Sequence, residues 1–256
     1  DIKPREIGPG TSPNVIWDIY SDNPTGIDPY NFTPGTVSSG GQQDNGGITG
    51  GIEGVFYNRE HSVPQSWFGA NASPTSVGPE SDYFHVYPTD KEVNSNRGNF
   101  IYGVVNAPTI TSSNGSKLGP NTVVGLSGIA FEPINKYKGD LARSFFYFVT
   151  RYQGNMLAWE TLNTEGDKAF DGSTWPSIEI PYLNMMLQWN NIDPVSQKEI
   201  DRNNAGYTLQ GNRNPYIDHP EYVAAVWVSV CASTLPVDIT SFTGLYKDNT
   251  VKLSWN

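Results

Sequence analysis

Several features that define other protein classes are scarce or absent in this sequence of 256 residues. A single cysteine, Cys231, excludes an internal disulfide framework and a cysteine-rich metal cluster. No apolar run approaches the ~20 residues of a membrane span, so we expect no membrane insertion. Charged residues are only 16% and aromatic residues 12%, a balance that excludes a coiled coil and argues against wholesale disorder.

Positive charge is also scarce. The net charge of −10 argues by itself against a nucleic-acid partner. The distribution is uneven, however, because residues 91–151 contain seven basic and three acidic residues, a local balance of +4, and the rest of the chain sums to −14. Such a stretch can meet phosphates on an acidic protein, or it can be an ordinary solvated face. If the chain binds nucleic acid, we expect residues 91–151 to form the binding face.

Turn signals and apolar periodicity predict short strands in the first half and helices in the second. The expected strands are 15–20, 53–64 and a loose edge strand within 121–132. The expected helices are a short one capped by Thr89 or Asp90 and stopped by Gly98, one over 140–152, one over 182–189, and one from a cap at 193–194 to residue 203. Periodicity cannot decide whether 222–230 is a helix or a buried strand.

The pattern of apolar and polar residues changes after Pro236. Apolar and polar residues alternate around Lys247-Asp248-Asn249, which is typical of a hairpin turn. This stretch resembles the opening strands of a fibronectin type III-like module, although two strands are marginal alone. We therefore expect a main domain over 1–235 and a two-stranded stub over 236–256 that packs on the main domain or belongs to a longer chain.

Glu60 and His61 are adjacent on the second expected strand. A carboxylate can bind a metal ion and an imidazole can act as a base, so one short piece of backbone can supply both. Strand neighbours point to opposite faces, so the chain must bend here if both side chains are to reach one substrate. From spacing alone, an exposed salt-bridging pair is the simpler interpretation.

A second group of polar residues lies on the short helix that follows. Asn94 and Arg97 are three residues apart and share a helix face. A carboxamide oxygen is a reasonable ligand for a hard metal ion, and a guanidinium group forks onto phosphate. The alternative is that Asn94 and Asn96 are poor helix formers that end the helix before Gly98.

Three ordered motifs carry a family resemblance. Residues 58–68 read Asn-Arg-Glu-His-Ser-Val-Pro-Gln-Ser-Trp-Phe, residues 88–99 contain Pro-Thr-Asp, Glu-Val-Asn and Arg-Gly-Asn, and residues 210–220 read Gln-Gly-Asn-Arg-Asn-Pro-Tyr-Ile-Asp-His-Pro. From about residue 15 to 230 the chain resembles the endonuclease I family of secreted bacterial nucleases, which belongs to the His-Me finger (ββα-metal) superfamily. The resemblance implies an α+β fold, with a His-Me finger core, additional helices and irregular loops.

The resemblance also implies roles for the matching positions. His61 would be the general base that activates water, Glu60 and Asn94 would hold one divalent ion, and Arg97 would lie near the scissile phosphate. The implied ion is Mg²⁺, for which Ca²⁺ or Mn²⁺ can substitute. Further contacts with phosphate or DNA are expected from Arg59, Lys91 and Arg213. The family often has a histidine pair where this chain has only His85, which we interpret as structural support.

We therefore expect a secreted, periplasmic or cell-surface endonuclease that cleaves DNA without sequence preference and leaves 5′-phosphate ends, with RNA as a second candidate substrate. Nothing resembles a base-reading module, and no obligate protein partner is evident. The chemistry agrees, because a neutral His61 can take a proton from water near pH 7 if a carbonyl holds its other nitrogen. The alternative is a non-catalytic adhesion or binding module on a nuclease-like scaffold. A phosphatase is disfavoured because no two-metal cluster is evident.

Several other residues have two interpretations. Asp218-His219-Pro220 can be a second metal site, but a rigid loop is favoured. Asp18, Asp22 and Asp28 can bind a structural Ca²⁺, but aspartates are commoner as turn formers. We expect Cys231 to be a buried small hydrophobe, and Trp67 and Phe68 to belong to the core.

Overall fold

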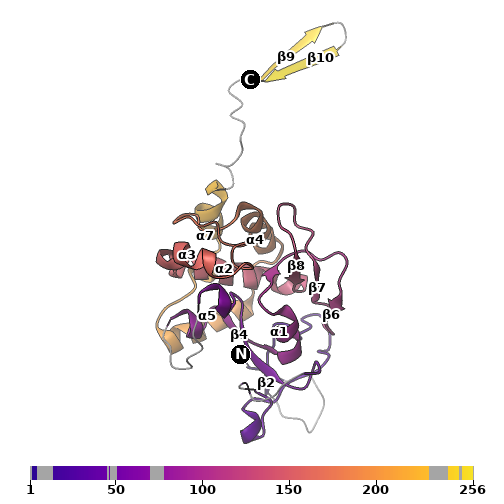
Figure 1. Cartoon of the computed structure of the whole chain (residues 1–256), viewed down its shortest axis with the longest axis vertical. Helices are drawn as coiled ribbons and strands as arrows, with labels where there is room; N and C mark the ends of the chain where they lie inside the picture. Colours follow the sequence, from indigo (N-terminus) through magenta and orange to yellow (C-terminus); the bar gives the residue numbers. More distant parts are fainter. Residues whose placement is uncertain are drawn as a thin grey trace.

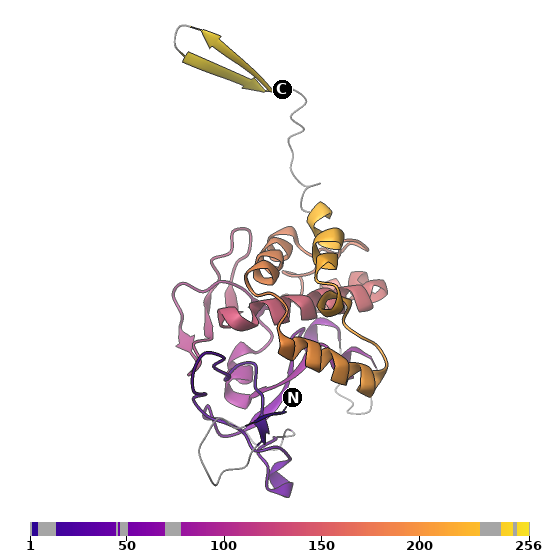
Figure 2. The same ribbon diagram turned by 180° about the vertical axis from the view of Figure 1, so that it is seen from behind.

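The computed structural model describes residues 2–4, 14–44, 46, 51–69, 78–230, 242–247 and 250–255. Its α-helices are α1 (Lys91–Arg97), α2 (Lys138–Arg151), α3 (Gln153–Trp159), α4 (Ile180–Ile192), α5 (Gln197–Gln210), α6 (Pro215–Asp218) and α7 (Glu221–Val223). Its strands are β1 (Ile2–Pro4), β2 (Asn14–Ile16), β3 (Tyr57–His61), β4 (Val86–Asp90), β5 (Ile101–Tyr102), β6 (Ile110–Thr111), β7 (Lys117–Pro120), β8 (Ile129–Glu132), β9 (Phe242–Lys247) and β10 (Thr250–Trp255). The expected α+β class is confirmed, and Figure 1 and Figure 2 show strands gathered on one side of the body and helices on the other.

The central feature of the first half is the order β3, β4, α1, which we call the ββα unit. β3 and β4 pair antiparallel, with Tyr57 opposite Asp90 and His61 opposite Val86. The helix begins directly after β4 because the Asp90 side chain accepts a hydrogen bond from the backbone nitrogen of Val93. It ends at Gly98, whose positive φ of 55° is a conformation that glycine adopts without strain. The predicted start and stop of this helix are confirmed.

The two strands expected over 15–20 and 53–64 are shorter than the sequence suggests. The strand expected over 53–64 is reduced to β3. The strand expected over 15–20 ends at residue 16, because Asp18 forms a turn with its carbonyl accepting from the nitrogen of Asp22 and its side chain from the nitrogen of Tyr20. This local hydrogen bonding competes with strand pairing, as is common for aspartate.

A second sheet has the strand order β5-β8-β7-β6. The edge strand expected within 121–132 is wrong in position, because β8 is an internal strand that pairs parallel with β5 and antiparallel with β7. Three of its four residues, Ala130, Phe131 and Glu132, are buried. The loose alternation of the sequence could not reveal the parallel partner, which is only two residues long.

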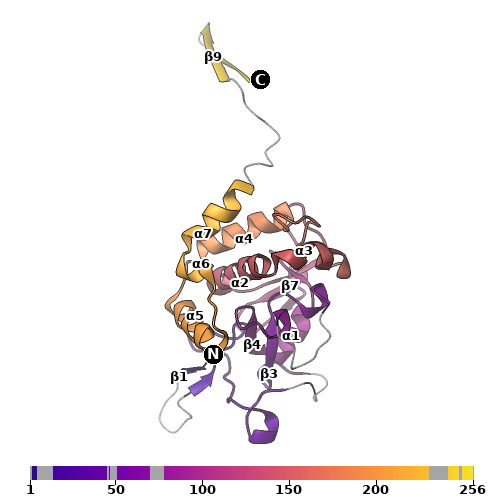
Figure 3. The ribbon, with the colours of Figure 1, turned by 90° about the vertical axis from the view of Figure 1, so that its left-hand side faces the viewer.

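Helix α2 runs through the centre of the body. Its residues from Lys138 to Val149 are all buried, because α4 covers one side and the ββα unit lies on the other (Figure 3). Aromatic rings fill these contacts; Phe145 meets the ring of Tyr182 edge-on at 5.1 Å, and Phe148 meets His85 at 4.8 Å. Trp67 and Phe68 are part of the same core, as expected. The predicted helix over 140–152 is therefore confirmed. Helix α2 begins two residues earlier, at Lys138, and ends one residue earlier, at Arg151.

The C-terminal elements correct one predicted boundary. Helix α5 is capped by Ser196, whose side chain and that of Glu199 form a capping box, rather than by residues 193–194. The ambiguous segment after residue 221 is helical, with α7 followed by a π-helical turn over Ala224–Val228. Strands β9 and β10 pair antiparallel, with Lys247 opposite Thr250, which confirms the predicted hairpin. Cys231 lies outside the described residues, and no described helix is long and apolar enough to cross a membrane.

Candidate active site

The side chains of Glu60 and His61 lie on opposite faces of β3, as alternation requires. Glu60 is only 2% exposed and points toward α1 and the sheet behind it. His61 is half-buried at the last position of the strand and contacts the segment before β4. The exposed salt-bridging pair is excluded, because the carboxylate is internal and the imidazole contacts other groups.

Glu60 is held by a tyrosine hydroxyl and a guanidinium group. The Tyr20 hydroxyl donates to Glu60 Oε1 at 2.8 Å, and Arg97 Nε lies 3.4 Å from the same oxygen. A second hydroxyl, that of Tyr102, lies 2.8 Å from the hydroxyl of Tyr20. Burial raises the pKa of Glu60 above its ordinary value, while Arg97 and Tyr20 oppose that rise. The result is a carboxylate whose position is fixed from two sides.

Arg97 is buried inside the protein, which does not fit a direct contact with substrate phosphate. Its side chain is 1% exposed, and it donates to the carbonyls of Ser62 at 2.8 Å and Gly98 at 3.1 Å. Its guanidinium carbon also lies 4.8 Å from the centre of the Tyr102 ring. We therefore correct the expected contact with the scissile phosphate: in this arrangement Arg97 is the internal counter-ion of Glu60.

His61 is oriented by a backbone carbonyl. Its Nε2 lies 2.9 Å from the carbonyl oxygen of Glu80. A carbonyl oxygen only accepts, so Nε2 carries the ring proton and Nδ1 has the free electron pair. Burial lowers the pKa of His61 below its ordinary value of 6.5, the Glu80 carbonyl opposes this, and Arg59 and Arg97 add to the lowering. The imidazole is therefore neutral at pH 7, the form a general base requires.

His85 lies behind His61 and is fully buried. The two rings meet edge-on with centroids 5.5 Å apart, and His85 Nε2 forms a short hydrogen bond with the carbonyl of Pro79. Burial keeps the pKa of His85 well below its ordinary value. These contacts are what the interpretation of His85 as structural support requires.

Asn94 is half-buried and faces β3 from α1. Its side-chain nitrogen donates to Asn58 Oδ1 at 2.8 Å and to the carbonyl of Arg59 at 3.2 Å. Because both acceptors engage the amide nitrogen, the amide oxygen is the end that remains for another partner. Asn58 and Glu60 share a face of β3, so this oxygen and the Glu60 carboxylate belong to the same junction of β3 and α1.

This junction fits a divalent cation. A carboxylate and an amide oxygen are hard ligands, and two protein ligands leave several positions for water and phosphate, which is how Mg²⁺ is usually bound. Among the described residues, no group of three or more His, Cys, Asp and Glu side chains could hold a metal ion. A metal site among these residues would therefore contain at most two such side chains, and the Asn94 amide oxygen is available to act beside the one carboxylate of Glu60.

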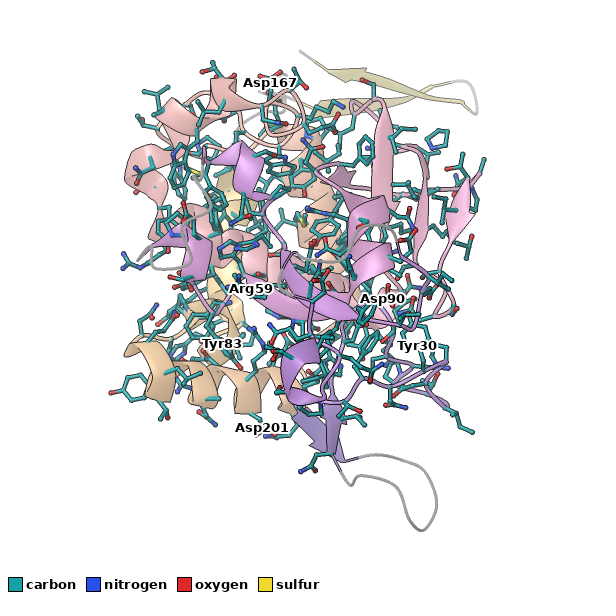
Figure 4. The ribbon with its side chains drawn as sticks, turned by 60° about the horizontal axis from the view of Figure 1, so that its bottom comes forward. Tyr30, Arg59, Tyr83, Asp90, Asp167 and Asp201 are labelled. Carbon is teal, nitrogen blue, oxygen red and sulfur yellow. The ribbon has the colours of Figure 1, made fainter. Side chains whose placement is uncertain are left out.

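The three further phosphate-binding candidates differ in their surroundings. Arg59, labelled in Figure 4, is exposed. It shares a face of β3 with His61 and pairs with no acid among the described residues. Lys91 lies 2.7 Å from Asp44. Arg213 donates through two nitrogens to Asp218, at 2.7 Å each. Only Arg59 has both the exposure and the place beside His61 that a phosphate contact needs.

The basic segment 91–151 does not form a continuous cationic face. Arg97 and Arg143 are buried, the latter in a two-pronged pair with Glu199 at 2.7 and 2.8 Å. Lys138 is also buried and lies 2.6 Å from Glu132, which Lys117 approaches to 3.7 Å. The expected binding face is therefore wrong in most of its residues. The exposed cations of the segment that form no ion pair with a described residue are Lys136 and Arg151.

Two motifs that the sequence offers as alternative metal sites have local structural roles. Asp218 accepts from Arg213 and from Asn203 at 3.1 Å, and His219 lies 3.2 Å from Glu221. Among the N-terminal aspartates, Asp18 accepts from the backbone nitrogen of Asp90 at 2.7 Å and so ties its turn to the start of α1. Burial raises the pKa of Asp18 to about 7. These contacts favour the loop and turn interpretations.

Sequence reasoning missed Tyr20, Tyr102 and Glu80. The two hydroxyls that position Glu60 come from aromatic residues whose pattern is that of ordinary core positions. Glu80 acts through its backbone carbonyl, so its side-chain type carries no signal. The expectation that a carbonyl holds one nitrogen of His61 was the closest available indication.

Comparison with known proteins gives consistent results. The sequence model of the Endonuclease I family matches residues 9–221. An extracellular ribonuclease of Bacillus amyloliquefaciens is 36% identical over 198 residues, covering 75% of this chain and 59% of that protein. An extracellular ribonuclease of Bacillus subtilis strain 168 is 35% identical over 218 residues, covering 83% of this chain and 67% of that protein. An endonuclease-1 of Buchnera aphidicola (from Acyrthosiphon pisum) is 25% identical over 138 residues, 54% of this chain and 44% of that protein. The chain thus spans about three fifths to two thirds of the two Bacillus proteins.

Proposed function

The chain belongs to the Endonuclease I family, and we propose that it is a metal-dependent nuclease that hydrolyses phosphodiester bonds and leaves 5′-phosphate ends. The observation that carries this proposal is the hydrogen bond of 2.9 Å between His61 Nε2 and the Glu80 carbonyl. It directs the basic nitrogen of a neutral imidazole away from the loop at His61, the last residue of β3, where the strand ends and one substrate can reach both His61 and Glu60.

His61 acts as the general base. Its Nδ1 takes a proton from the attacking water, and the Glu80 carbonyl stabilises the imidazolium that forms, because a hydrogen-bond acceptor favours the charged ring. The lowered pKa of His61 keeps the ring neutral before the reaction at pH 7.

Glu60 and Asn94 are the residues that would hold the divalent ion, with Mg²⁺ the expected species. When bound, such an ion neutralises charge on the phosphate and assists departure of the 3′ oxygen. Tyr20 and Arg97 fix the Glu60 carboxylate, and Asn58 fixes the Asn94 amide, so both ligands are oriented before an ion arrives. Rotamer entropy is thus lost on folding rather than on binding.

Arg59 binds the substrate backbone beside the scissile bond. It is an exposed guanidinium two residues before His61 on the same strand face, and guanidinium groups form two-pronged hydrogen bonds with phosphate. A contact of this kind reads no bases, so cleavage is expected to be independent of sequence. Both DNA and RNA offer the required phosphodiester; the names of the two Bacillus relatives make RNA a substrate to test from the outset. Those names also support export from the cell.

The test is cleavage of supercoiled plasmid and of a structureless RNA, each with Mg²⁺ and with excess EDTA. We expect cleavage that EDTA abolishes and that added Mg²⁺ restores, with 5′-phosphate ends that a ligase can join on DNA. The His61→Ala variant is the control for a contaminating nuclease. Cleavage that persists in EDTA, or a His61→Ala variant as active as the parent, would contradict the proposal.

A further inference from the structure

Two neighbouring carbonyls of one loop hold both histidine rings of the site. We call residues 78–85 the carbonyl loop. The Glu80 carbonyl accepts from His61 Nε2, and the Pro79 carbonyl accepts from His85 Nε2. The place of this loop therefore determines which nitrogen of His61 carries the proton.

Backbone hydrogen bonds fix the position of the carbonyl loop only in part. Its far end is tied to β3, because Ser62 donates from its backbone nitrogen to the His85 carbonyl at 2.8 Å. The part that contains Glu80 is a single turn of 3-10 helix, closed by a hydrogen bond of 3.2 Å from Ser81 to Gly78. Among the described residues, no strand or long helix contains this turn, and side chains hold the loop: Arg202 donates to the carbonyl of Tyr83 and Ser144 to that of Phe84, each at 2.7 Å.

Asp82, the residue directly after the turn, anchors it from within the loop. It is 6% exposed, and its carboxylate accepts four hydrogen bonds from described residues. Oδ1 accepts from the backbone nitrogen of Phe84 at 3.1 Å and from Gln210 Nε2 at 2.9 Å. Oδ2 accepts from the hydroxyls of Tyr147 and Tyr152, each at 2.8 Å. Asp82 thus links the carbonyl loop to Tyr147 on α2, to Tyr152 directly after α2, and to Gln210 at the end of α5.

The donors are themselves held in place. Burial raises the pKa of Tyr147 and of Tyr152, and the nearby carboxylate raises both further, so both hydroxyls stay protonated donors. Gln210 also accepts from the backbone nitrogen of Tyr83 at 3.0 Å, and Asn212 donates to the Tyr147 hydroxyl at 2.7 Å. The motif that begins at Gln210 therefore has a role that its sequence did not reveal: Gln210 hydrogen-bonds the carbonyl loop directly, and Asn212 hydrogen-bonds Tyr147, which binds Asp82.

We propose that Asp82 is a positioning residue for the base: by joining the carbonyl loop to Tyr147, Tyr152 and Gln210, it keeps the Glu80 carbonyl on His61 Nε2. Asp82 does not touch substrate. Its effect on cleavage rests on the proposed nuclease function, whereas its effect on the His61 tautomer is a property of the folded protein alone and can be measured without substrate.

The tautomer is accessible because the chain contains only three histidines. We would record ¹⁵N spectra of histidine-labelled protein at a pH where His61 is neutral. The parent should show His61 as the Nε2–H tautomer. In Asp82→Asn, which keeps the shape but replaces one acceptor oxygen with a donor, His61 should become a mixture of tautomers. The exposed His219 should not change in either protein.

Asp193→Asn is the matched control. Asp193 is also buried and accepts from a backbone nitrogen, that of Gly139 at 2.9 Å, but it is not in contact with the carbonyl loop. Because no hydrogen bond or ion pair joins Asp193 to a described residue of the carbonyl loop, this variant should leave the His61 signals unchanged. A folded Asp82→Asn protein whose His61 remains wholly Nε2–H, or an equal disturbance by Asp193→Asn, would overturn the proposal.

Kinetics provide a second readout. Asp82→Asn should lower kcat on the order of 10- to 100-fold, as outer contacts of active-site residues often do, with little change in KM. In a His61→Ala background the same substitution should have no further effect, because both changes act through one group. Losses that multiply would show that Asp82 acts elsewhere and would also overturn the proposal.

Gln210→Ala serves if Asp82→Asn does not fold. It removes one donor from Asp82 and one acceptor from Tyr83 at an exposed position, so it should shift the His61 tautomer less but in the same direction. An unchanged tautomer in this variant would count against the proposal. If the tautomer shifts but the parent cleaves no nucleic acid, the proposed function fails and the positioning role of Asp82 stands.

Discussion

Replacing Arg97 with alanine should unfold the protein at a much lower temperature, because the guanidinium is an internal group. The substitution removes donors from the carbonyls of Ser62 and Gly98 and leaves the Glu60 carboxylate buried beside Tyr20 without its counter-ion. Removing one partner of a buried ion pair costs about 3–5 kcal/mol. For a domain of this size, 1 kcal/mol corresponds to roughly 2–4 °C in Tm, so we expect a drop of about 6–20 °C.

The loss should also depend on pH. Arg97 opposes the rise that burial imposes on the pKa of Glu60, so its removal raises that pKa further. A carboxyl group whose pKa is raised by folding favours the fold below its ordinary pKa of 4.5 and loses this contribution as pH rises through the folded value. The Tm of Arg97→Ala should therefore lie furthest below that of the parent at neutral pH, and the difference should narrow as pH falls toward 4.5.

Arg59→Ala is the matched comparison. Arg59 is exposed and forms no ion pair with a described residue, so its loss should change stability by no more than about 0.5 kcal/mol. Calorimetry of both variants between pH 4 and 8, with cleavage assays well below either Tm, separates the two roles. Arg59→Ala should melt with the parent and cleave poorly. An Arg97→Ala protein that melts with the parent but has lost cleavage would refute the internal role of Arg97.

Three further predictions concern the chemistry. His61→Ala should lower turnover about 10²- to 10⁴-fold while calorimetric titration shows near-parental metal affinity, because the base is not a ligand; a large loss of affinity would contradict this. The acid limb of kcat/KM should have its midpoint below 6.5, since the folded pKa of His61 is lowered and only the neutral ring accepts a proton; a midpoint above 7 would point to another base. Glu60→Ala and Asn94→Ala should each lose metal affinity and cleavage together, and a variant that binds metal and cleaves normally would exclude that ligand.

Local signals in the sequence were sufficient for the helices α1 and α2. The cap at Asp90, the stop at Gly98 and the apolar spacing of α2 are each set by residues within one or two helical turns. Helices of this kind can be predicted because the interactions that define them are close in sequence. No strand was expected over 86–90, so β4 and its pairing with β3 followed only from the family resemblance.

The surroundings of the site could not be predicted in the same way. Glu60 is positioned by Tyr20, 40 residues earlier, and its counter-ion Arg97 is 37 residues later. From the sequence alone, either Arg59 or Arg97 could have faced the phosphate. The same limit applies to Asp82, whose partner Gln210 is 128 residues away. The sequence predicts which side chains have useful chemistry, but their partners depend on which long-range contacts form.

How this acidic protein can bind a polyanion depends on which cations of residues 91–151 remain available to phosphate. Because most cations of residues 91–151 serve internal ion pairs, the backbone contacts that this segment leaves for nucleic acid are few: Arg59 beside it, and Lys136 or Arg151 further out. Each phosphate neutralised contributes roughly −0.9 to the log–log dependence of affinity on salt for duplex DNA. Binding of His61→Ala to DNA in Ca²⁺ should therefore show a slope of about −1 to −3, and affinity should fall sharply when the ion is removed. A slope steeper than about −5, or binding that is insensitive to the ion, would mean that a larger cationic surface exists and that the polyanion does not depend on the junction of β3 and α1.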